Sequence, residues 1–157
     1  MKVKFITDIN LGKLLKWLRI LGYDTVVYTH NANREFLRKA EKEERVVLTR
    51  KKDMATRQFS GCLVIINSDY VMDQLNEVMD KLSLSPDEER IFTICVKCNE
   101  QLMKAEKQEI SGMVPEHILS NHSDFHICKR CNAVFWPGTH RDNVQNYLRT
   151  HIRRHHP

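Results

Sequence analysis

Two Cys-x-x-Cys pairs constrain the fold of this 157-residue chain more than any other feature. The first pair is Cys95 and Cys98, the second is Cys128 and Cys131, and an Asn follows each pair. Such a turn brings two sulfur atoms to one side of the backbone, and two turns supply the four thiolates that a tetrahedral zinc ion binds at about 2.3 Å. We therefore expect one structural zinc ion, held by all four cysteines in a small zinc-ribbon module.

Two other uses of these cysteines fit the sequence less well. Disulfides are typical of secreted proteins, and the N-terminal residues MKVKFITD enter a strand pattern without a secretory signal. A thioredoxin-like redox pair lies where a strand meets a helix, and neither pair has that setting. The module has few apolar residues, so metal binding should supply much of its folding free energy. The long spacer 99–127 is expected to contain its own hairpin or short helix, formed by PEHILSNH (115–122).

The first part of the chain alternates between strand and helix patterns. This alternation is typical of an α/β fold with a mostly parallel sheet and helices on both faces. Strands are predicted at 3–7, 25–28, 45–49 and 62–66, and helices at 11–21, 33–44 and 68–82. The Ser, Pro and acid cluster SLSPDEE (83–89) ends the pattern. The expected division is an α/β domain at 1–84, a zinc ribbon at 90–150 and a basic, His-rich tail at 151–157.

The net charge of +5 is distributed unevenly along the chain. Basic residues dominate the segments 1–60 and 91–157, whereas acidic residues dominate 61–90. This pattern suits a polyanionic partner such as RNA, although an ordinary solvated surface can have the same composition. Within helix 11–21 the polar side has three cations, which either contact phosphates or are only solvated: Lys13, Lys16 and Arg19. No long apolar run suggests a membrane span, so we expect a soluble, cytoplasmic protein.

Two acids follow predicted strands of the sheet. Asp8 follows the first strand and Asp53 follows the third. Ligand sites in open α/β sheets lie outside the carboxyl ends of the strands, where carboxylates bind magnesium or manganese and stabilise phosphoryl transfer. Asp8 or Asn10 could equally cap the helix that follows. The sequence leaves a helix cap and a catalytic metal site as equal alternatives for Asp8.

The chain resembles the Mut-seven C-terminal RNase family, a PIN-like nuclease domain followed by a four-cysteine zinc ribbon. The resemblance rests on TDINLGKLLKWLRILGYDT, RVVLTRKKDM, IFTICVKCNEQL and ICKRCNAVFWPGTH, in this order and spacing. It implies a metal-dependent, RNA-cleaving domain in which Asp8 is the first metal ligand and a Thr-Arg-Asp-type turn after the third strand supplies another. Arg50, Lys51 and Lys52 would join the helix cations in contacting RNA.

The sequence departs from this family pattern at two acidic positions. Lys51 stands where the family typically has Asp, which leaves Asp53 as the nearest acid. Asn33 stands where related PIN-like proteins usually have Asp, which leaves Glu35. A lysine in a cation site opposes metal binding by Coulomb repulsion. Two hypotheses therefore stand: a metal-dependent ribonuclease that uses Asp8, Asp53 and Glu35, and a PIN-like module that binds RNA or a partner after loss of catalysis.

Overall fold

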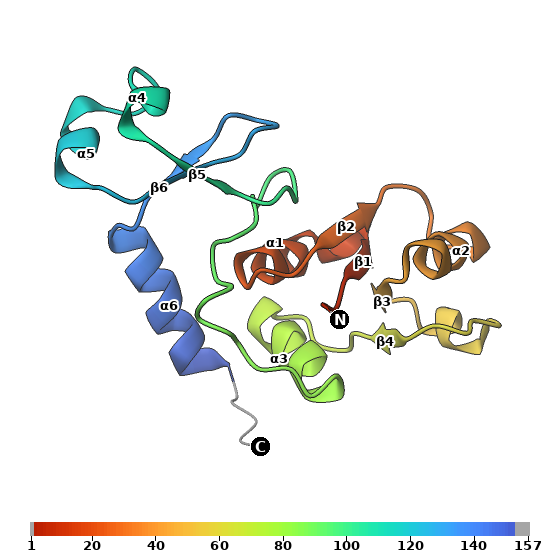
Figure 1. Cartoon of the computed structure of the whole chain (residues 1–157). Helices are drawn as coiled ribbons and strands as arrows, with labels where there is room; N and C mark the ends of the chain where they lie inside the picture. Colours follow the sequence, from red (N-terminus) through yellow and green to blue (C-terminus); the bar gives the residue numbers. More distant parts are fainter. Residues whose placement is uncertain (1, 153–157) are drawn as a thin grey trace.

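The first sheet in the computed structural model, which describes residues 2–152, consists of four parallel strands (Figure 1). Its strand order is β2-β1-β3-β4. The strands are β1 (Phe5–Asp8), β2 (Thr25–Tyr28), β3 (Val46–Thr49) and β4 (Leu63–Ile65). All their carboxyl ends lie at one edge of the sheet, with Asp8 beside Tyr28 in the register of β1 and β2. The predicted parallel sheet is confirmed.

Helices cover both faces of this sheet because neighbouring strand residues point to opposite sides. Phe5 and Leu48 pack on the face covered by α1 and α3, whereas Ile6 and Val47 pack on the face covered by α2. The helices are α1 (Gly12–Ile20), α2 (Arg34–Glu43) and α3 (Val71–Lys81), with short 3₁₀ turns η1 (Ile9–Leu11) and η2 (Lys52–Thr56). The predicted helices correspond to these three, and the first predicted helix begins as η1.

Gly22 ends α1 and permits a close approach of the chain segment that follows the α/β part. Its φ of 82° lies in the left-handed region, where glycine has no steric cost. A Cβ atom here would collide with the backbone carbonyl of Arg90. The Arg90 guanidinium also donates a hydrogen bond to the Gly22 carbonyl at 3.0 Å. The end of α1 is thus built to receive the start of the next module.

A second, antiparallel sheet forms the centre of what we call the ribbon module, residues 91–138. Its strands are β5 (Met103–Ala105), β6 (Phe125–Ile127) and β7 (Val134–Phe135), in the order β5-β6-β7. The connection from β5 to β6 contains α4 (Lys107–Ile110) and α5 (Glu116–Asn121). Phe125 and Ile110 are fully buried in its own small core. The short helix expected at 115–122 is confirmed as α5.

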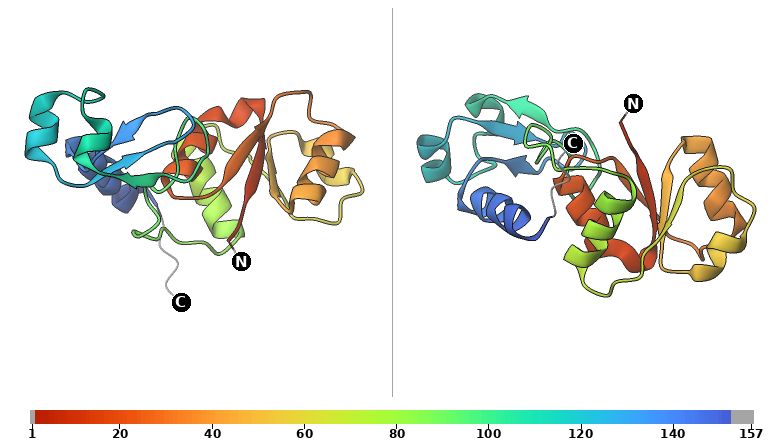
Figure 2. Two further views of the ribbon diagram at one scale, coloured as in Figure 1. Left: turned by 45° about the horizontal axis from the view of Figure 1, so that its top comes forward. Right: turned by 90° about the horizontal axis from the view of Figure 1, so that it is seen from below.

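The sequence analysis did not predict α6 (Thr139–His151), which returns from the ribbon module to the first sheet. Its residues Val144 and Leu148 belong to the same core as α1 and α3. Tyr147 stacks on Trp17 of α1 with ring centroids 5.6 Å apart. The views in Figures 1 and 2 agree in placing α6 beyond α1 and α3, on the side of the sheet opposite to α2. This helix therefore completes the core of the first sheet.

Two remaining predictions concern the basic tail and membrane-spanning helices. Most of the expected basic tail at 151–157, from residue 153 onward, lies outside the described residues. Within residues 2–152, no helix has the length and apolar character needed to cross a membrane.

Candidate functional site

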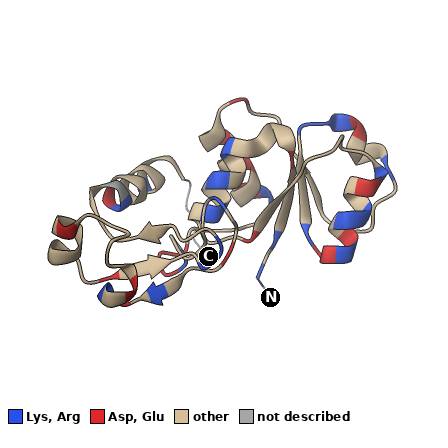
Figure 3. Cartoon of the chain, turned by 90° about the horizontal axis from the view of Figure 1, so that it is seen from above, with Lys and Arg blue, Asp and Glu red and all other residues tan. Residues whose placement is uncertain are grey.

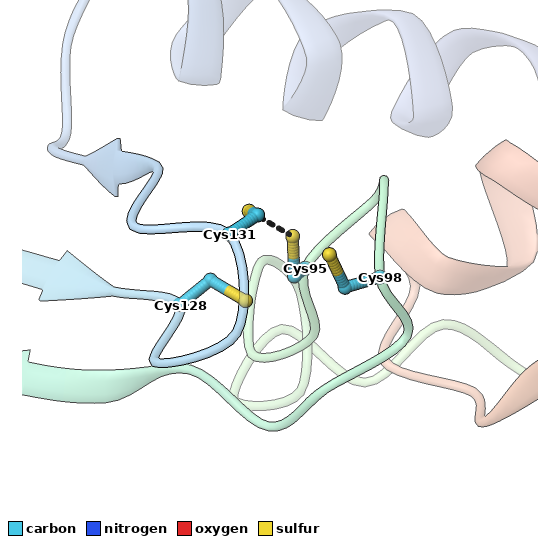
Figure 4. Close-up of side chains that lie close together, drawn as sticks. All are labelled: Cys95, Cys98, Cys128 and Cys131. Atoms are coloured by element: carbon cyan, nitrogen blue, oxygen red, sulfur yellow. Dashed lines mark hydrogen bonds between the residues drawn. The ribbon is translucent and has the colours of Figure 1, made fainter.

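Four cysteine sulfur atoms meet at the base of the ribbon module (Figure 4). They all lie within 4.8 Å of one another, and the sulfur atoms of Cys95 and Cys131 are 3.8 Å apart. A tetrahedral zinc ion with Zn–S bonds of about 2.3 Å requires sulfur atoms about 3.8 Å apart. The cluster is thus positioned to hold a metal ion, and its donors fit zinc. In residues 2–152, no other group of three or more His, Cys, Asp or Glu residues is positioned to hold a metal ion.

The two cysteine turns have the same backbone construction. In the first turn, the N–H of Asn99 donates to the Cys95 carbonyl at 2.9 Å, and Asn99 has a φ of 63°. In the second turn, the N–H of Asn132 donates to the Cys128 carbonyl at 2.8 Å, and its φ is 59°. Asn tolerates this left-handed conformation better than most residues. The Asn after each pair therefore has a local reason: it closes the turn that presents the two sulfur atoms.

The four thiols influence one another's ionisation. A hydrogen bond from the Ala133 backbone lowers the pKa of Cys131 to about 7. Desolvation, followed by the neighbouring thiol of Cys131, raises the pKa of Cys98 to about 12. Like charges this close disfavour further ionisation, so four thiolates do not form together without a positive charge among them. A divalent metal ion bound among them would supply that charge.

Arg19 joins α1 to the first cysteine turn. The prediction that Arg19 lies on an exposed basic face with Lys13 and Lys16 is wrong, because Arg19 is only 8% exposed. Its Nη1 atom donates to the carbonyls of Val96 (2.8 Å) and Lys97 (3.2 Å). Both acceptors lie between the cysteines of the first pair. Helical periodicity alone did not reveal this, since it cannot show that another module covers the polar side of a helix.

The buried guanidinium of Arg19 also donates a hydrogen bond to the sheet and interacts electrostatically with the thiols. Its Nε atom donates to the carbonyl of Thr25 in β2 at 2.9 Å. Burial lowers the pKa of Arg19, and the nearby thiols of Cys95 and Cys98 act in the opposite direction. The positive charge therefore lies where the negative charge of metal-bound thiolates develops. One side chain fixes α1, β2 and the metal-binding turn to one another.

Asn99 makes a second link between the cysteine turn and the sheet. Its Oδ1 atom accepts a hydrogen bond from the Thr25 backbone N–H at 2.9 Å, and its Nδ2 atom donates to Asp24 at 2.6 Å. Asp24 also forms an ion pair with Arg45 at 2.8 Å. Partial burial raises the pKa of Asp24, but the hydrogen bonds from Arg45 and Asn99 outweigh this and hold it below its ordinary value. The junction is thus a polar network that joins Asn99, Asp24 and Arg45.

We expect Arg19→Met to lower the free energy of unfolding by about 3 kcal/mol. Methionine keeps the apolar stem but leaves the carbonyls of Thr25, Val96 and Lys97 without their donor, and each unmet acceptor costs about 1–3 kcal/mol. Urea unfolding of the metal-loaded chain measures the change. Lys16→Met is the matched control, since Lys16 is exposed on the same helix and should change stability by less than about 0.5 kcal/mol. An equal free energy of unfolding for both variants would contradict the role assigned to Arg19.

Asp8 is buried at the carboxyl edge of the parallel sheet. It is 3% exposed, and its Oδ1 atom accepts the backbone N–H of Asn10 at 2.8 Å, which caps η1. Its Oδ2 atom accepts the Thr49 hydroxyl at 2.6 Å and the backbone N–H of Arg50 at 3.4 Å. The capping alternative for Asp8 is therefore confirmed. The same carboxylate also fixes the turn that follows β3, a link that the sequence did not indicate.

The basic turn after β3 is tied to its surroundings. Lys51 donates its ammonium to the backbone carbonyl of Ala32 at 3.0 Å, in the loop before α2. Arg50 pairs with Asp69 at 2.5 Å. Lys52, like Lys13 and Lys16 of α1, is exposed and forms no ion pair within the described part of the chain. Lysine and arginine occur on helices of both parts of the molecule in Figure 3. Lys13, Lys16 and Lys52 thus present exposed ammonium groups without an ion pair among the described residues.

The other two predicted catalytic acids, Asp53 and Glu35, form ion pairs with arginines. Asp53 lies in η2 with a side chain 57% exposed, 3.6 Å from Arg57. Glu35 lies in the first turn of α2, 62% exposed and 2.6 Å from Arg38. Asn33 caps α2 by accepting the backbone N–H of Glu35 at 2.9 Å. The structure does not bring Asp8, Asp53 and Glu35 into one group able to hold a metal ion, and these acids therefore do not fit a magnesium or manganese site as they stand.

A comparison with protein families finds one match over nearly the whole chain. The model described as the Mut7-C RNAse domain matches residues 3–148. No curated protein sequence and no solved structure matches the chain. The matched range includes the parallel sheet, the four cysteines of the cluster and most of α6. The two modules described above are therefore matched together.

Proposed function

This chain belongs to the Mut7-C RNAse domain family, and from that membership we propose that it binds RNA and cleaves it at the carboxyl edge of the parallel sheet. The observation that carries the proposal is the turn after β3, where the buried Asp8 accepts the backbone N–H of Arg50, the first of three consecutive basic residues. In open α/β sheets this edge is the usual place for a ligand. Arg50, Lys51 and Lys52 all follow the strand end there.

The residues at this edge have distinct proposed roles. Lys13, Lys16 and Lys52 would contact the phosphates of RNA, because their charges are unpaired within the described residues and a polyanion releases counterions on binding them. Arg50 and Lys51 are held in place by Asp69 and Ala32, so they would present fixed positive charge to the same strand. Asp8 is proposed to act directly in cleavage through its negative charge, and it would also orient this set through Thr49 and the Arg50 backbone.

The metal at the four cysteines is proposed to be a structural zinc ion. Four sulfur ligands are typical of zinc, and a site closed by four protein ligands has no open position for substrate. When bound, the zinc ion would neutralise the thiolates and hold the two turns together. A magnesium or manganese ion at Asp8 remains a prediction from the family resemblance, whereas Asp8, Asp53 and Glu35 are dispersed and do not form a site for it.

A second candidate function, RNA binding without cleavage, is favoured by one observation. The ammonium of Lys51 is anchored at the Ala32 carbonyl, near the edge where the family pattern expects an acid. A fixed positive charge there opposes a divalent cation by Coulomb repulsion. The ribonuclease proposal therefore requires cleavage of RNA by the wild-type protein, assayed on single-stranded RNA with manganese present. Binding without any cleavage would favour the second candidate.

We expect Lys13→Glu/Lys16→Glu to weaken RNA binding and to reduce its salt dependence. Each lost phosphate contact should decrease the slope of log affinity against log salt by about 0.7 on single strands. Fluorescence anisotropy of a labelled oligonucleotide at several salt concentrations measures the slope. The control Lys39→Glu/Lys42→Glu makes the same charge change at the end of α2 that leads to the start of β3, opposite to the proposed edge. Equal slopes for both double variants would mean that only net charge matters.

Arg19 is left unchanged in this experiment for a structural reason. Its side chain is buried against the cysteine turn, so a charge reversal there would disturb the junction as well as any RNA contact. The two exposed lysines test the surface of α1 without that ambiguity.

A further inference from the structure

A cavity of about 280 Å³ lies where the ribbon module meets the start of α6. Three aromatic side chains line it: Phe92 before the first cysteine turn, Phe135 in β7 and Trp136 directly after β7. Arg141 in the first turn of α6 and His126 in β6 add polar groups to this lining. The cavity lies in the ribbon module: Phe135 packs against the cysteine cluster, but no cysteine and no residue of the Asp8 edge lines the cavity. Neither of those sites accounts for it.

Phe92 is held in an unusual backbone conformation at this cavity. Its φ of 62° lies in the left-handed region, which is disfavoured for a bulky side chain. Its backbone N–H donates to the Ile20 carbonyl at the end of α1 at 2.9 Å. The contact with α1 and the aromatic lining of the cavity thus both depend on this strained residue. Such outliers persist where the surrounding structure enforces them and often mark functional sites.

Positive charge borders the aromatic walls. The Arg141 guanidinium lies 5.6 Å from the centre of the Phe92 ring, and within the described residues it has no ion pair. Lys104, His126 and Phe135 are register partners across β5, β6 and β7, so they share one face of the ribbon sheet. Lys104 is exposed and also has no ion pair in the described part of the chain. His126 lies 3.7 Å from Asp124, so the local charge is mixed and the two free cations are the positive groups available.

We propose that this cavity binds one unpaired nucleobase of an RNA strand, with Arg141 contacting the adjoining phosphate. The inference rests on the proposed function, since it assumes that RNA is the ligand. Aromatic walls stack on the flat face of any base, and bases in single-stranded RNA are free to enter such a site. The volume lies just below the range of about 300–1,000 Å³ typical of small-molecule pockets, which suits one base. A free arginine beside aromatic rings supplies the charge complementary to phosphate.

The fluorescence of Trp136 reports directly on base stacking in the cavity. The sequence has two tryptophans, Trp17 and Trp136, so Trp17→Phe leaves Trp136 as the only one while keeping an aromatic ring against Tyr147. In this full-length, zinc-loaded variant, single-stranded oligoadenylate should quench the fluorescence of Trp136. The same oligoadenylate annealed to oligouridylate should not, because its bases are paired. A quench by the single strand alone supports the proposal.

Two further variants test the site without relying on Trp136. Phe92→Gly removes the ring from the cavity and from its packing against the core of the first sheet, while glycine adopts the left-handed conformation without strain, so the backbone should be retained. Arg141→Gln removes the charge at the start of α6. Each should weaken binding of oligoadenylate about tenfold, the effect expected from losing about one stacking or charged contact. Lys107→Gln in α4 is the matched control, since it removes one exposed positive charge from the same module outside the cavity lining.

The outcomes separate this proposal from the proposed function. Wild-type affinity for oligoadenylate in both cavity variants, together with unchanged Trp136 fluorescence, would overturn the cavity site while RNA binding by the chain stands. A wild-type protein that binds no RNA at low salt would overturn both. Quenching of Trp136 by an apolar peptide but not by single-stranded RNA would assign the cavity to a protein partner and overturn the nucleobase proposal.

Discussion

Removal of the cysteine-bound metal is expected to unfold the ribbon module and to loosen the edge of the parallel sheet with it. Structural zinc contributes about 10–16 kcal/mol of apparent binding free energy in zinc-finger peptides, more than the small apolar core around Phe125 supplies. Because Arg19 and Asn99 join the first cysteine turn to β2, the loss should spread beyond the module. Hydrogen exchange of the full chain should show loss of protection at the Thr25 and Phe92 amides after chelation.

A pair of serine substitutions makes this test independent of the chelator. Cys128→Ser removes a fully buried member of the cluster and should reproduce the exchange pattern of the chelated protein. Cys62→Ser is the matched control, because Cys62 is exposed and lies outside the cluster. Elemental analysis should find one zinc per chain in wild type and in the Cys62 variant. Full protection at Thr25 in metal-free protein would show that the junction does not depend on the metal.

Asp8→Asn is expected to reduce RNA cleavage by at least about a hundredfold, the usual contribution of a group that acts directly in the reaction. The substitution keeps the shape of the side chain and removes its charge. It should also cost about 1–3 kcal/mol of stability, because an amide nitrogen in the place of Oδ2 cannot accept the Arg50 N–H. Cleavage rates on single-stranded RNA and urea unfolding measure the two effects separately.

Thr49→Val is the control that separates the charge of Asp8 from its structural contacts. Valine removes the hydroxyl that donates to Asp8 but leaves the carboxylate in place. This variant should lose comparable stability and keep most of its activity. An equal loss of activity in both variants would mean that Asp8 acts only by holding the turn after β3.

A substitution at Lys51 then distinguishes the two candidate functions. Lys51→Asp restores the acid of the family pattern and removes the charge anchored at Ala32, so it should strengthen manganese binding and cleavage if the site is only weakened. Lys52→Asp makes the same charge change one residue away and should have a smaller effect. Absence of cleavage in wild type and in the Lys51 variant, with RNA binding retained, would support the binding module without catalysis.

The parts of the fold that the sequence predicted are those with strong local patterns. The four strands and three helices of the first sheet follow from alternating and helical periodicities, and Gly22 ends α1 as its position suggests. The four cysteines come together because their spacing leaves few other arrangements. The match of the family model to residues 3–148 agrees with the resemblance stated from the same motifs.

The parts that the sequence did not predict depend on contacts between distant segments. Nothing local shows that Arg19 turns toward Val96, that Thr49 donates to Asp8, or that α6 completes the first core. Arg19 has the same helical spacing as the exposed Lys16, and only the docking of another module separates their environments. The Asn after each cysteine pair was visible as a repeat, but the bond between Asn99 and Thr25 was not.

The place of α6 in the first core has a consequence for how the nascent chain folds on the ribosome. Val144, Leu148 and Ile152 fill the same core as Leu14 and Leu18, yet they are synthesised long after them. Because the ribosome adds about 5–20 residues per second, the apolar side of α1 lacks its last packing partners for several seconds. During this interval, chaperones or other unfinished chains can bind to the apolar side of α1. Premature termination before α6 would leave that surface exposed permanently, so shortened products of this chain should be prone to aggregation and rapid degradation.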